Sequence, residues 1–396
     1  MEDNKAHATL SASSAHKWLV CTPSARLEEQ FPSKTSEYMQ EGTLAHAIAE
    51  FKVRSYFLEP MTKTTQTRRL NKFKKEEGFQ DEMLEHTDTY LNFLKEEALK
   101  TNTKPFISVE QKVDFSSYVP EGFGTADCIM ISGDTLHIID FKYGKGVKVE
   151  AEDNPQMKLY ALGAISAYGL FYPLKNIKMS IVQPRIDNIS SYEMPIEQLL
   201  EWGEKTVKPQ AQKAFAGIGD YVQGEHCRFC RAKGACEFRA KENMKVIEKI
   251  QNSYNGTITN DELGEMLTKT DGIEQWIKDI KTYALDLVLK GEQVKGWKAV
   301  EGKSNRKISD IDKAFEILEA NGYEEALLYE KVPLTLTKLE KVVGKTKLAE
   351  AIGDYIEKPK GAPTLVKESD KREPYRVSAA EEFGGSQWQR TSLLIN

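Results

Sequence analysis

Residues 121–164 read EGFGTADCIMISGDTLHIIDFKYGKGVKVEAEDNPQMKLYALGA, and this stretch decides the fold. An apolar run, a Gly133-Asp134 turn and a second apolar run are followed by a pattern typical of a helix. Short β-rich runs bounded by turn residues are typical of a β-hairpin. We therefore predict two buried strands that lead directly into a helix.

Three charged residues lie in the predicted hairpin, where an unpaired buried charge is costly. Asp127 is on the first strand, whereas Asp140 and Lys142 point to one face of the second because strand side chains alternate. Two carboxylates suit a hard divalent cation, and a nearby lysine can orient or help to deprotonate water and stabilise phosphate charge. The alternative is a strand-end ion pair between Asp140 and Lys142, with Asp127 in a turn.

The composition is that of a globular protein of one large core or two smaller ones. The 396 residues are 40% hydrophobic and 29% charged. No apolar run approaches the roughly 20 residues of a membrane helix, and the first ten residues lack the layout of a signal peptide. We expect a cytoplasmic protein with no membrane partner. The net charge of −5 requires any nucleic-acid binding to come from local basic patches.

The most basic segment is residues 62–75, TKTTQTRRLNKFKK, which has six Lys and Arg residues and no acidic one. Two interpretations stay open: a solvated loop or helix surface, and a patch that contacts phosphates.

Helical spacing of apolar residues predicts helices at 36–58 and 79–100, and strands follow at 106–113, 177–183 and 189–194. His46 lies near the apolar stripe of the first helix. Two interpretations stay open: a core residue, and a nitrogen ligand of a metal ion. Gln156 and Tyr160, four residues apart, share one face of a helix, where they are an exposed pair or part of a site. Helix returns at 195–216.

Five cysteines are unevenly spaced, and clustered thiols in a reducing compartment more often bind metal than form disulfides. Cys227, Cys230 and Cys236 have the spacing C-x2-C-x5-C, which can grip one metal centre. Cys21 is the expected fourth ligand, although alone it is typical of a small buried residue. Cys128, beside Asp127 on the hairpin, is interpreted as a core residue.

Three regions are expected. Residues 1–251 form a domain closed by the cysteines, residues 252–358 a mainly helical accessory module, and residues 359–396 an extended or disordered tail. Within the module we expect a short strand at 296–300 followed by helices.

Together these motifs resemble the PD-(D/E)XK nuclease superfamily in its RecB-like, iron–sulfur branch, over residues 11–240. Four segments resemble the motifs G-x-x-x-H, G-x-x-D, D/E-x-K and Q-x-x-x-Y: Gly42–His46, Gly124–Asp127, Asp140–Lys142 and Gln156–Tyr160. The cysteines resemble the cluster arrangement of AddB-type and CRISPR-associated nucleases. The end of the chain is similar to a phage or prophage family of unknown function.

The resemblance implies an α/β fold with a restriction-endonuclease-like core, a central mixed β-sheet flanked by helices, and a C-terminal helical module. It implies Mg²⁺ or Mn²⁺ bound by His46, Asp127, Asp140 and the Phe141 carbonyl, with Glu110 and Glu50 as auxiliary carboxylates. The implied catalytic residues are Asp127, Asp140, Lys142, Gln156 and Tyr160. A [4Fe–4S] cluster would be held by Cys21, Cys227, Cys230 and Cys236, with Zn²⁺ as the alternative.

The expected function is a metal-dependent DNA exonuclease in phage replication or recombination, in the cytoplasm of the bacterial host. DNA is the expected partner, and phage replication or recombination proteins are expected as further partners. The alternative is a non-catalytic DNA-binding or scaffold protein that retains the nuclease fold.

Overall fold

The computed structural model describes residues 8–32, 37–101, 103–251, 256–270, 272–301, 308, 310–329, 335–356 and 373. The chain divides into two compact units, Met1–Glu301 and Gly302–Asn396. The first unit thus extends beyond residue 252, where the accessory module is expected to start. The expected tail, 359–396, lies outside the described residues except for Glu373.

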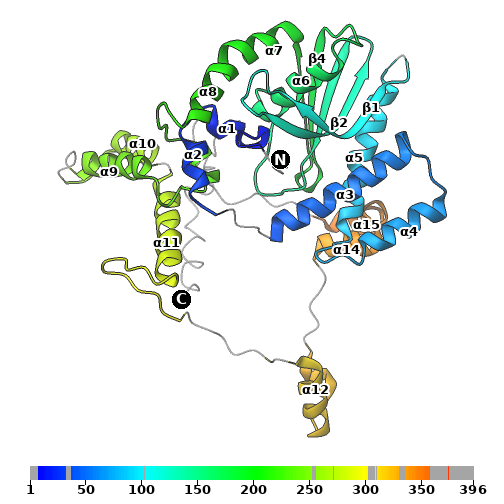
Figure 1. The fold of residues 1–396 in the computed structure, drawn as a ribbon. Helices are drawn as coiled ribbons and strands as arrows, with labels where there is room; N and C mark the ends of the chain where they lie inside the picture. The colour runs from blue at the N-terminus through cyan, green and yellow to red at the C-terminus, as the bar shows by residue number, and fades with distance from the viewer. Residues whose placement is uncertain are drawn as a thin grey trace. The chain divides into compact units, whose positions relative to one another are not determined.

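The first unit is built on one five-stranded sheet in the order β1-β2-β3-β4-β5 (Figure 1). The strands are β1 Phe106–Asp114, β2 Phe123–Ser132, β3 Thr135–Phe141, β4 Asn176–Gln183 and β5 Asn188–Pro195. Only β3 and β4 pair in parallel, and the other neighbours are antiparallel. The predicted mixed sheet and its β2–β3 hairpin are confirmed. The hairpin turns at Gly133, whose φ of 58° favours glycine.

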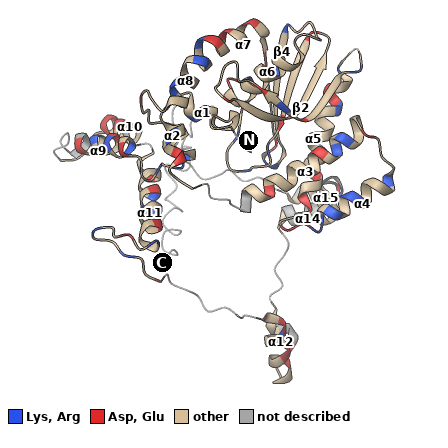
Figure 2. Cartoon of the chain, in the orientation of Figure 1, with Lys and Arg blue, Asp and Glu red and all other residues tan. Residues whose placement is uncertain are grey.

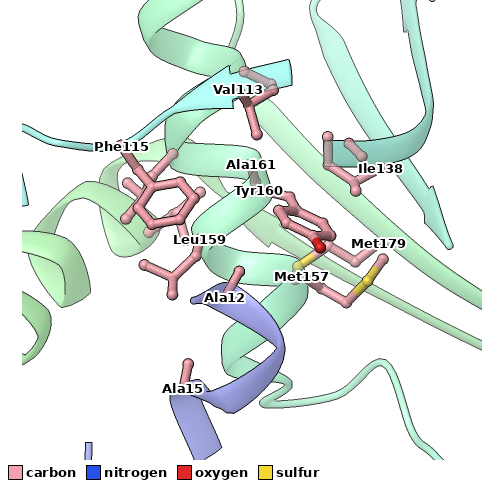
Figure 3. Packing of buried hydrophobic residues seen from close by; sticks show 14 of the residues in the cluster. Ala12, Ala15, Val113, Phe115, Ile138, Met157, Leu159, Tyr160, Ala161 and Met179 are labelled. Atoms are coloured by element: carbon pink, nitrogen blue, oxygen red, sulfur yellow. The ribbon is translucent and has the colours of Figure 1, made fainter. Parts of the chain in front are cut away.

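Helices cover both faces of this sheet. One apolar core joins the sheet to α6 Pro155–Tyr168, α7 Ile196–Trp202 and α8 Lys208–Ala216, and the other joins it to α3 Glu37–Phe57 and α5 Glu82–Leu99. Figure 3 shows Met157 and Tyr160 of α6 beside Ile138 and Met179 of the strands. The helix α6 is the crossover that parallel pairing of β3 and β4 requires.

The N-terminal segment adds the short helices α1 Ala15–Trp18 and α2 Ser24–Glu29, and α4 Lys63–Phe73 lies between α3 and α5 in the chain. The first unit ends with α9 Glu237–Gln251, α10 Asn260–Lys269 and α11 Ile273–Leu289. A buried ion pair between Arg239 and Asp279, 2.8 Å apart, ties α11 to α9. The helices α9 to α11 belong to the same compact unit as the sheet.

The described part of the second unit contains helices. Its helices are α12 Ile311–Ala320, α13 Glu325–Leu328, α14 Leu336–Val343 and α15 Lys345–Ile352. The strand predicted at 296–300 is wrong, since that region has only an isolated bridge between Val294 and Trp297. Among the described residues, every helix is too short or too polar to span a bilayer.

Candidate metal site and cysteine site

Three side chains from three elements converge beside the middle of β1 and β2. His46 of α3, Glu110 of β1 and Asp127 of β2 each offer a ligand atom, and these atoms lie within 4.8 Å of one another. Nδ1 of His46 is 3.5 Å from Oδ1 of Asp127. One imidazole and two carboxylates form a donor set suited to a divalent cation.

A local distortion of the sheet brings the two carboxylates together. Glu110 has a φ of 50°, in the left-handed region that a glutamate rarely adopts. On the neighbouring strand β2, Ala126 and Cys128 are two residues apart, yet their side chains belong to the two different apolar cores, on opposite faces of the sheet. The regular alternation of side chains along β2 is therefore interrupted at Asp127. Irregular strand geometry of this kind re-aims side chains and is frequent next to functional sites.

Backbone contacts hold Asp127 in place. The Phe141 N–H donates to Oδ2 of Asp127 over 2.7 Å, and the Phe141 ring lies 5.3 Å from the His46 ring. The N–H and C=O of one strand residue point to the same neighbouring strand. The Phe141 carbonyl is therefore directed toward β2, on the side of Asp127.

A second polar network adjoins the first. Nζ of Lys142 lies 3.1 Å from Oδ2 of Asp140 and donates to Oε1 of Gln156 over 3.1 Å. The Gln156 amide nitrogen donates to Oδ1 of Asp140 and to the hydroxyl of Tyr160, over 3.3 and 3.1 Å. Oδ2 of Asp140 is buried and accepts no well-directed hydrogen bond. Its nearest charged partner is the Lys142 ammonium.

The start of α6 fixes this network. The Asn154 side chain caps the helix by accepting the N–H groups of Gln156 and Met157, and Pro155 occupies the first turn. Tyr160 then packs so closely on β2 that a Cβ at Gly124 would lie 2.7 Å from its ring. Glycine at 124 thus allows the helix that carries Gln156 to approach the sheet.

The charges of the site shift its pKa values in different directions. Burial opposes the charged form of His46, but Asp127 and Asp140 raise its pKa to about 9. Burial and the charge of Asp127 raise the pKa of Glu110 to about 7. Burial also raises the pKa of Asp140. At Asp127 the positive charges of His46 and Lys142 outweigh the effect of burial, so the pKa of Asp127 is lowered. Despite its burial, Lys142 has a raised pKa because of Asp140 and Asp127, and remains an ammonium.

The structure thus brings together His46, Asp127, Asp140, Phe141, Lys142, Gln156 and Tyr160. The ligand group within 4.8 Å contains Glu110 and lacks Asp140, which is bound to Lys142 and Gln156. Glu50 pairs with Arg54 at 2.7 Å and stands outside this group. The catalytic and ligand roles of these residues stay predictions.

The four cysteines singled out in the sequence line one small cavity of about 20 Å³: Cys21, Cys227, Cys230 and Cys236. The cationic residues Lys17, Lys233 and Arg239 also line it. Hydrogen bonds with Cys21 and Cys227 raise the pKa of His226 to about 10. Cys128 lies away from this cavity, fully buried beside β3, as predicted.

Polar contacts hold the two chain segments of the cysteine site together. Lys17 and Glu28 form a buried ion pair of 2.7 Å, and Glu28 also accepts the N–H of Arg231. The Lys17 ammonium donates to the Phe229 carbonyl, and Thr22 donates to that of Ile218. The segment before α3 and the segment before α9 therefore meet at the cysteines.

The cysteine site is a candidate metal-binding site because four thiols line one cavity together with cationic side chains. Thiolates are ligands of both zinc ions and iron–sulfur clusters. The choice between these two centres stays a prediction.

A family model described as "Protein of unknown function (DUF2800)" matches residues 7–373. The chain belongs to the DUF2800 family. A solved structure described as "Crystal structure of SSO0001" is similar to this DUF2800 protein at 14% identity and a TM-score of 0.25, covering 49% of this chain and 95% of that chain. A likeness at that TM-score carries no argument here.

Two residues of this DUF2800 chain are more central than the sequence predicted. Glu110 was expected only as an auxiliary carboxylate, yet it belongs to the group with His46 and Asp127. Its signal was an acidic residue inside a predicted strand. His226 was not expected at the cysteine site, although it directly precedes Cys227 in the sequence.

Proposed function

We propose that this DUF2800 protein is a divalent-metal-dependent DNA nuclease of the PD-(D/E)XK, RecB-like type, acting as an exonuclease in phage replication or recombination. The observation that carries the proposal is the group of His46, Glu110 and Asp127 beside the ion pair of Asp140 and Lys142. Hard anionic oxygens and one ammonium next to each other suit the hydrolysis of a phosphodiester.

The roles follow from the geometry. His46, Glu110, Asp127 and Asp140 would hold Mg²⁺ or Mn²⁺, with the Phe141 carbonyl as a further ligand. A bound ion would polarise a phosphoryl oxygen and lower the pKa of water. Because imidazole suits Mn²⁺ better than Mg²⁺, we expect Mn²⁺ to support activity more strongly.

The remaining residues act as positioning groups and as a source of charge. The Lys142 ammonium, charged at neutral pH, would stabilise the negative charge that develops on the phosphate. Gln156 fixes that ammonium by accepting its hydrogen bond while donating to Asp140 and Tyr160. The Tyr160 hydroxyl in turn restricts the orientation of the Gln156 amide.

At the cysteine site we propose a [4Fe–4S] cluster bound by Cys21, Cys227, Cys230 and Cys236. The shared cavity and the adjacent cations support this proposal. The cluster would join the beginning and the end of the sheet-containing region. A brown protein with broad visible absorbance supports it, whereas a colourless protein that contains zinc contradicts it.

The test is a digestion time course with end-labelled linear DNA and circular DNA, with Mn²⁺, Mg²⁺ or a chelator. We expect Mn²⁺-dependent loss of linear DNA, because the ion completes the site, and persistence of circular DNA if the enzyme needs an end. Asp140→Asn should lower the rate about 10²- to 10³-fold. The matched control is Asp134→Asn, in the turn of the same hairpin, which should keep the wild-type rate.

Intact DNA in the presence of bound Mn²⁺ and an intact cysteine site would contradict the proposal. Metal-independent DNA binding without strand loss would then favour the non-catalytic alternative.

A further inference from the structure

The helix α4 is a cationic surface with no assigned role. Its segment contains six basic residues and no acidic one, in a chain whose net charge is −5. All six are exposed: Lys63, Arg68, Arg69, Lys72, Lys74 and Lys75. Figure 2 shows their colour recurring along α4. The apolar side of the helix, Leu70 and Phe73, packs against the core under α3.

The described carboxylates form no close ion pair with these cations. Among the described residues, none of the six has a carboxylate oxygen within 4.0 Å, whereas nearby Lys52 and Arg54 are paired with Asp88 and Glu50. Arg69 instead lies 5.8 Å above the Phe51 ring. A concentration of unpaired positive charge destabilises the protein unless an anionic partner binds there.

A groove connects α4 with the turn of α3 that carries the metal site. A cavity of about 580 Å³ between the two helices is lined by charges of both signs: Arg54, Arg69 and Lys72, and Glu50, Glu59 and Glu76. Glu50 lies one helical turn after His46, and Arg54 donates to the Val109 carbonyl, next to Glu110. A second concavity, of about 680 Å³, lies on the outer side of α4, and Lys72 borders both.

We propose that the exposed cationic side of α4, which borders the groove against α3, binds the phosphate backbone of the DNA strand that reaches the metal site. This inference rests on the proposed function and adds to it where the DNA lies. Charge complementarity selects the occupant, because regularly spaced phosphates match a row of unpaired Lys and Arg side chains. Contacts of this kind fix the position of a strand without reading its sequence, as a nuclease of broad specificity requires.

The test is the salt dependence of DNA binding, measured by fluorescence anisotropy without divalent metal so that no strand is cut. The variant carries Arg68→Gln, Arg69→Gln, Lys72→Gln and Lys75→Gln. Each lost phosphate contact makes the slope of log K against log salt shallower by about 0.7 to 0.9. We expect a change of roughly 3 in that slope and at least about tenfold weaker binding in low salt.

The matched control removes four exposed cations from α11 and the residues after it: Lys281→Gln, Lys290→Gln, Lys295→Gln and Lys298→Gln. This control changes the net charge by the same amount as the α4 variant. Its slope of log K against log salt should differ from the wild-type slope by no more than about 0.9, the change expected for one phosphate contact. Equal slopes for the two variants would overturn the inference. Circular dichroism and melting temperature establish that both variants are folded.

Two further outcomes separate this inference from the proposed function. If the α4 variant loses DNA binding but the wild-type protein does not cut DNA, the proposed DNA-binding role of α4 is supported and the nuclease proposal is contradicted. If the wild-type protein cuts DNA and the α4 variant has the wild-type KM and the wild-type salt slope, the nuclease proposal is supported and the DNA-binding role of α4 is contradicted. Binding of α4 to vesicles of phosphatidylserine and phosphatidylcholine, with no α4-dependent DNA binding, would also overturn the inference.

Discussion

The metal site and the cysteine site are built in opposite ways. At the metal site, Asp127 accepts a backbone N–H of β3, and Gln156 links Lys142 to Asp140, so the sheet and α6 hold the groups in place. The cysteine site joins segments about 200 residues apart through a few polar contacts such as Lys17 to Phe229. A site that the sheet builds should persist without its ion, whereas one that joins distant segments should depend on its cofactor.

The largest expected effect separates chemistry from folding at the metal site. Lys142→Gln keeps a hydrogen-bond donor near Asp140 but removes the positive charge, so DNA cleavage should fall about 10²- to 10³-fold. The melting temperature should change little because the network around Gln156 persists. Lys145→Gln, at an exposed lysine three residues later, is the control and should cleave at the wild-type rate.

The second prediction concerns the pH dependence of Mn²⁺ binding. The pKa of His46 is about 9, so binding at lower pH must displace a proton from its imidazole. Affinity should therefore rise roughly tenfold per pH unit from pH 7 to 9 and then level off. Electron paramagnetic resonance titrations at several pH values measure this. A pH-independent affinity over that range would show that His46 is not a ligand.

The third prediction concerns the dependence of the cysteine site on its cofactor. Cys230→Ser should abolish the visible absorbance and lower the melting temperature by roughly 10 °C, because the joined segments lose their link. Removal of the divalent ion with a chelator should lower it by much less. Cys128 lies in the apolar core between the sheet and the helices α3 and α5, so Cys128→Ala should retain the visible absorbance. Loss of the absorbance in this variant would contradict the assignment of the four cysteine ligands.

The smallest effect tests how α6 is seated. Gly124→Ala places a methyl group 2.7 Å from the Tyr160 ring, and such overpacking costs about 1–3 kcal/mol of unfolding free energy. Gly146→Ala, where the added Cβ has no neighbour within 4 Å, should cost less than about 0.5 kcal/mol. Urea denaturation gives both values, and equal values would show that Gly124 is not needed for close approach.

Local patterns predicted the mixed sheet well. The hairpin turn at Gly133, the strands beside it and the helix that begins after Asn154 follow from turn residues, alternation and capping, which act over a few neighbours. The strand at 296–300 was wrong because its apolar residues found no neighbouring strand beyond a single bridge. Strand formation depends on such a partner, which the local sequence does not show.

The candidate site was only partly predictable. The motifs indicated His46, Asp127, Asp140 and Lys142, and the structure brings them together. The importance of Glu110 depends on its left-handed backbone, which the surrounding tertiary structure imposes and no local pattern signals. In the same way, the end of the first unit at Glu301 depends on contacts such as Arg239 with Asp279, between residues far apart in the sequence.

The most direct test of the central claim is a crystal of the full chain soaked in Mn²⁺ and measured at the manganese absorption edge. The account predicts an anomalous peak among His46, Glu110 and Asp127, within ligand distance of the Asp140 carboxylate, that disappears in Asp127→Asn. A map without a peak there, or with its only peak at another place on the molecule, would contradict the account.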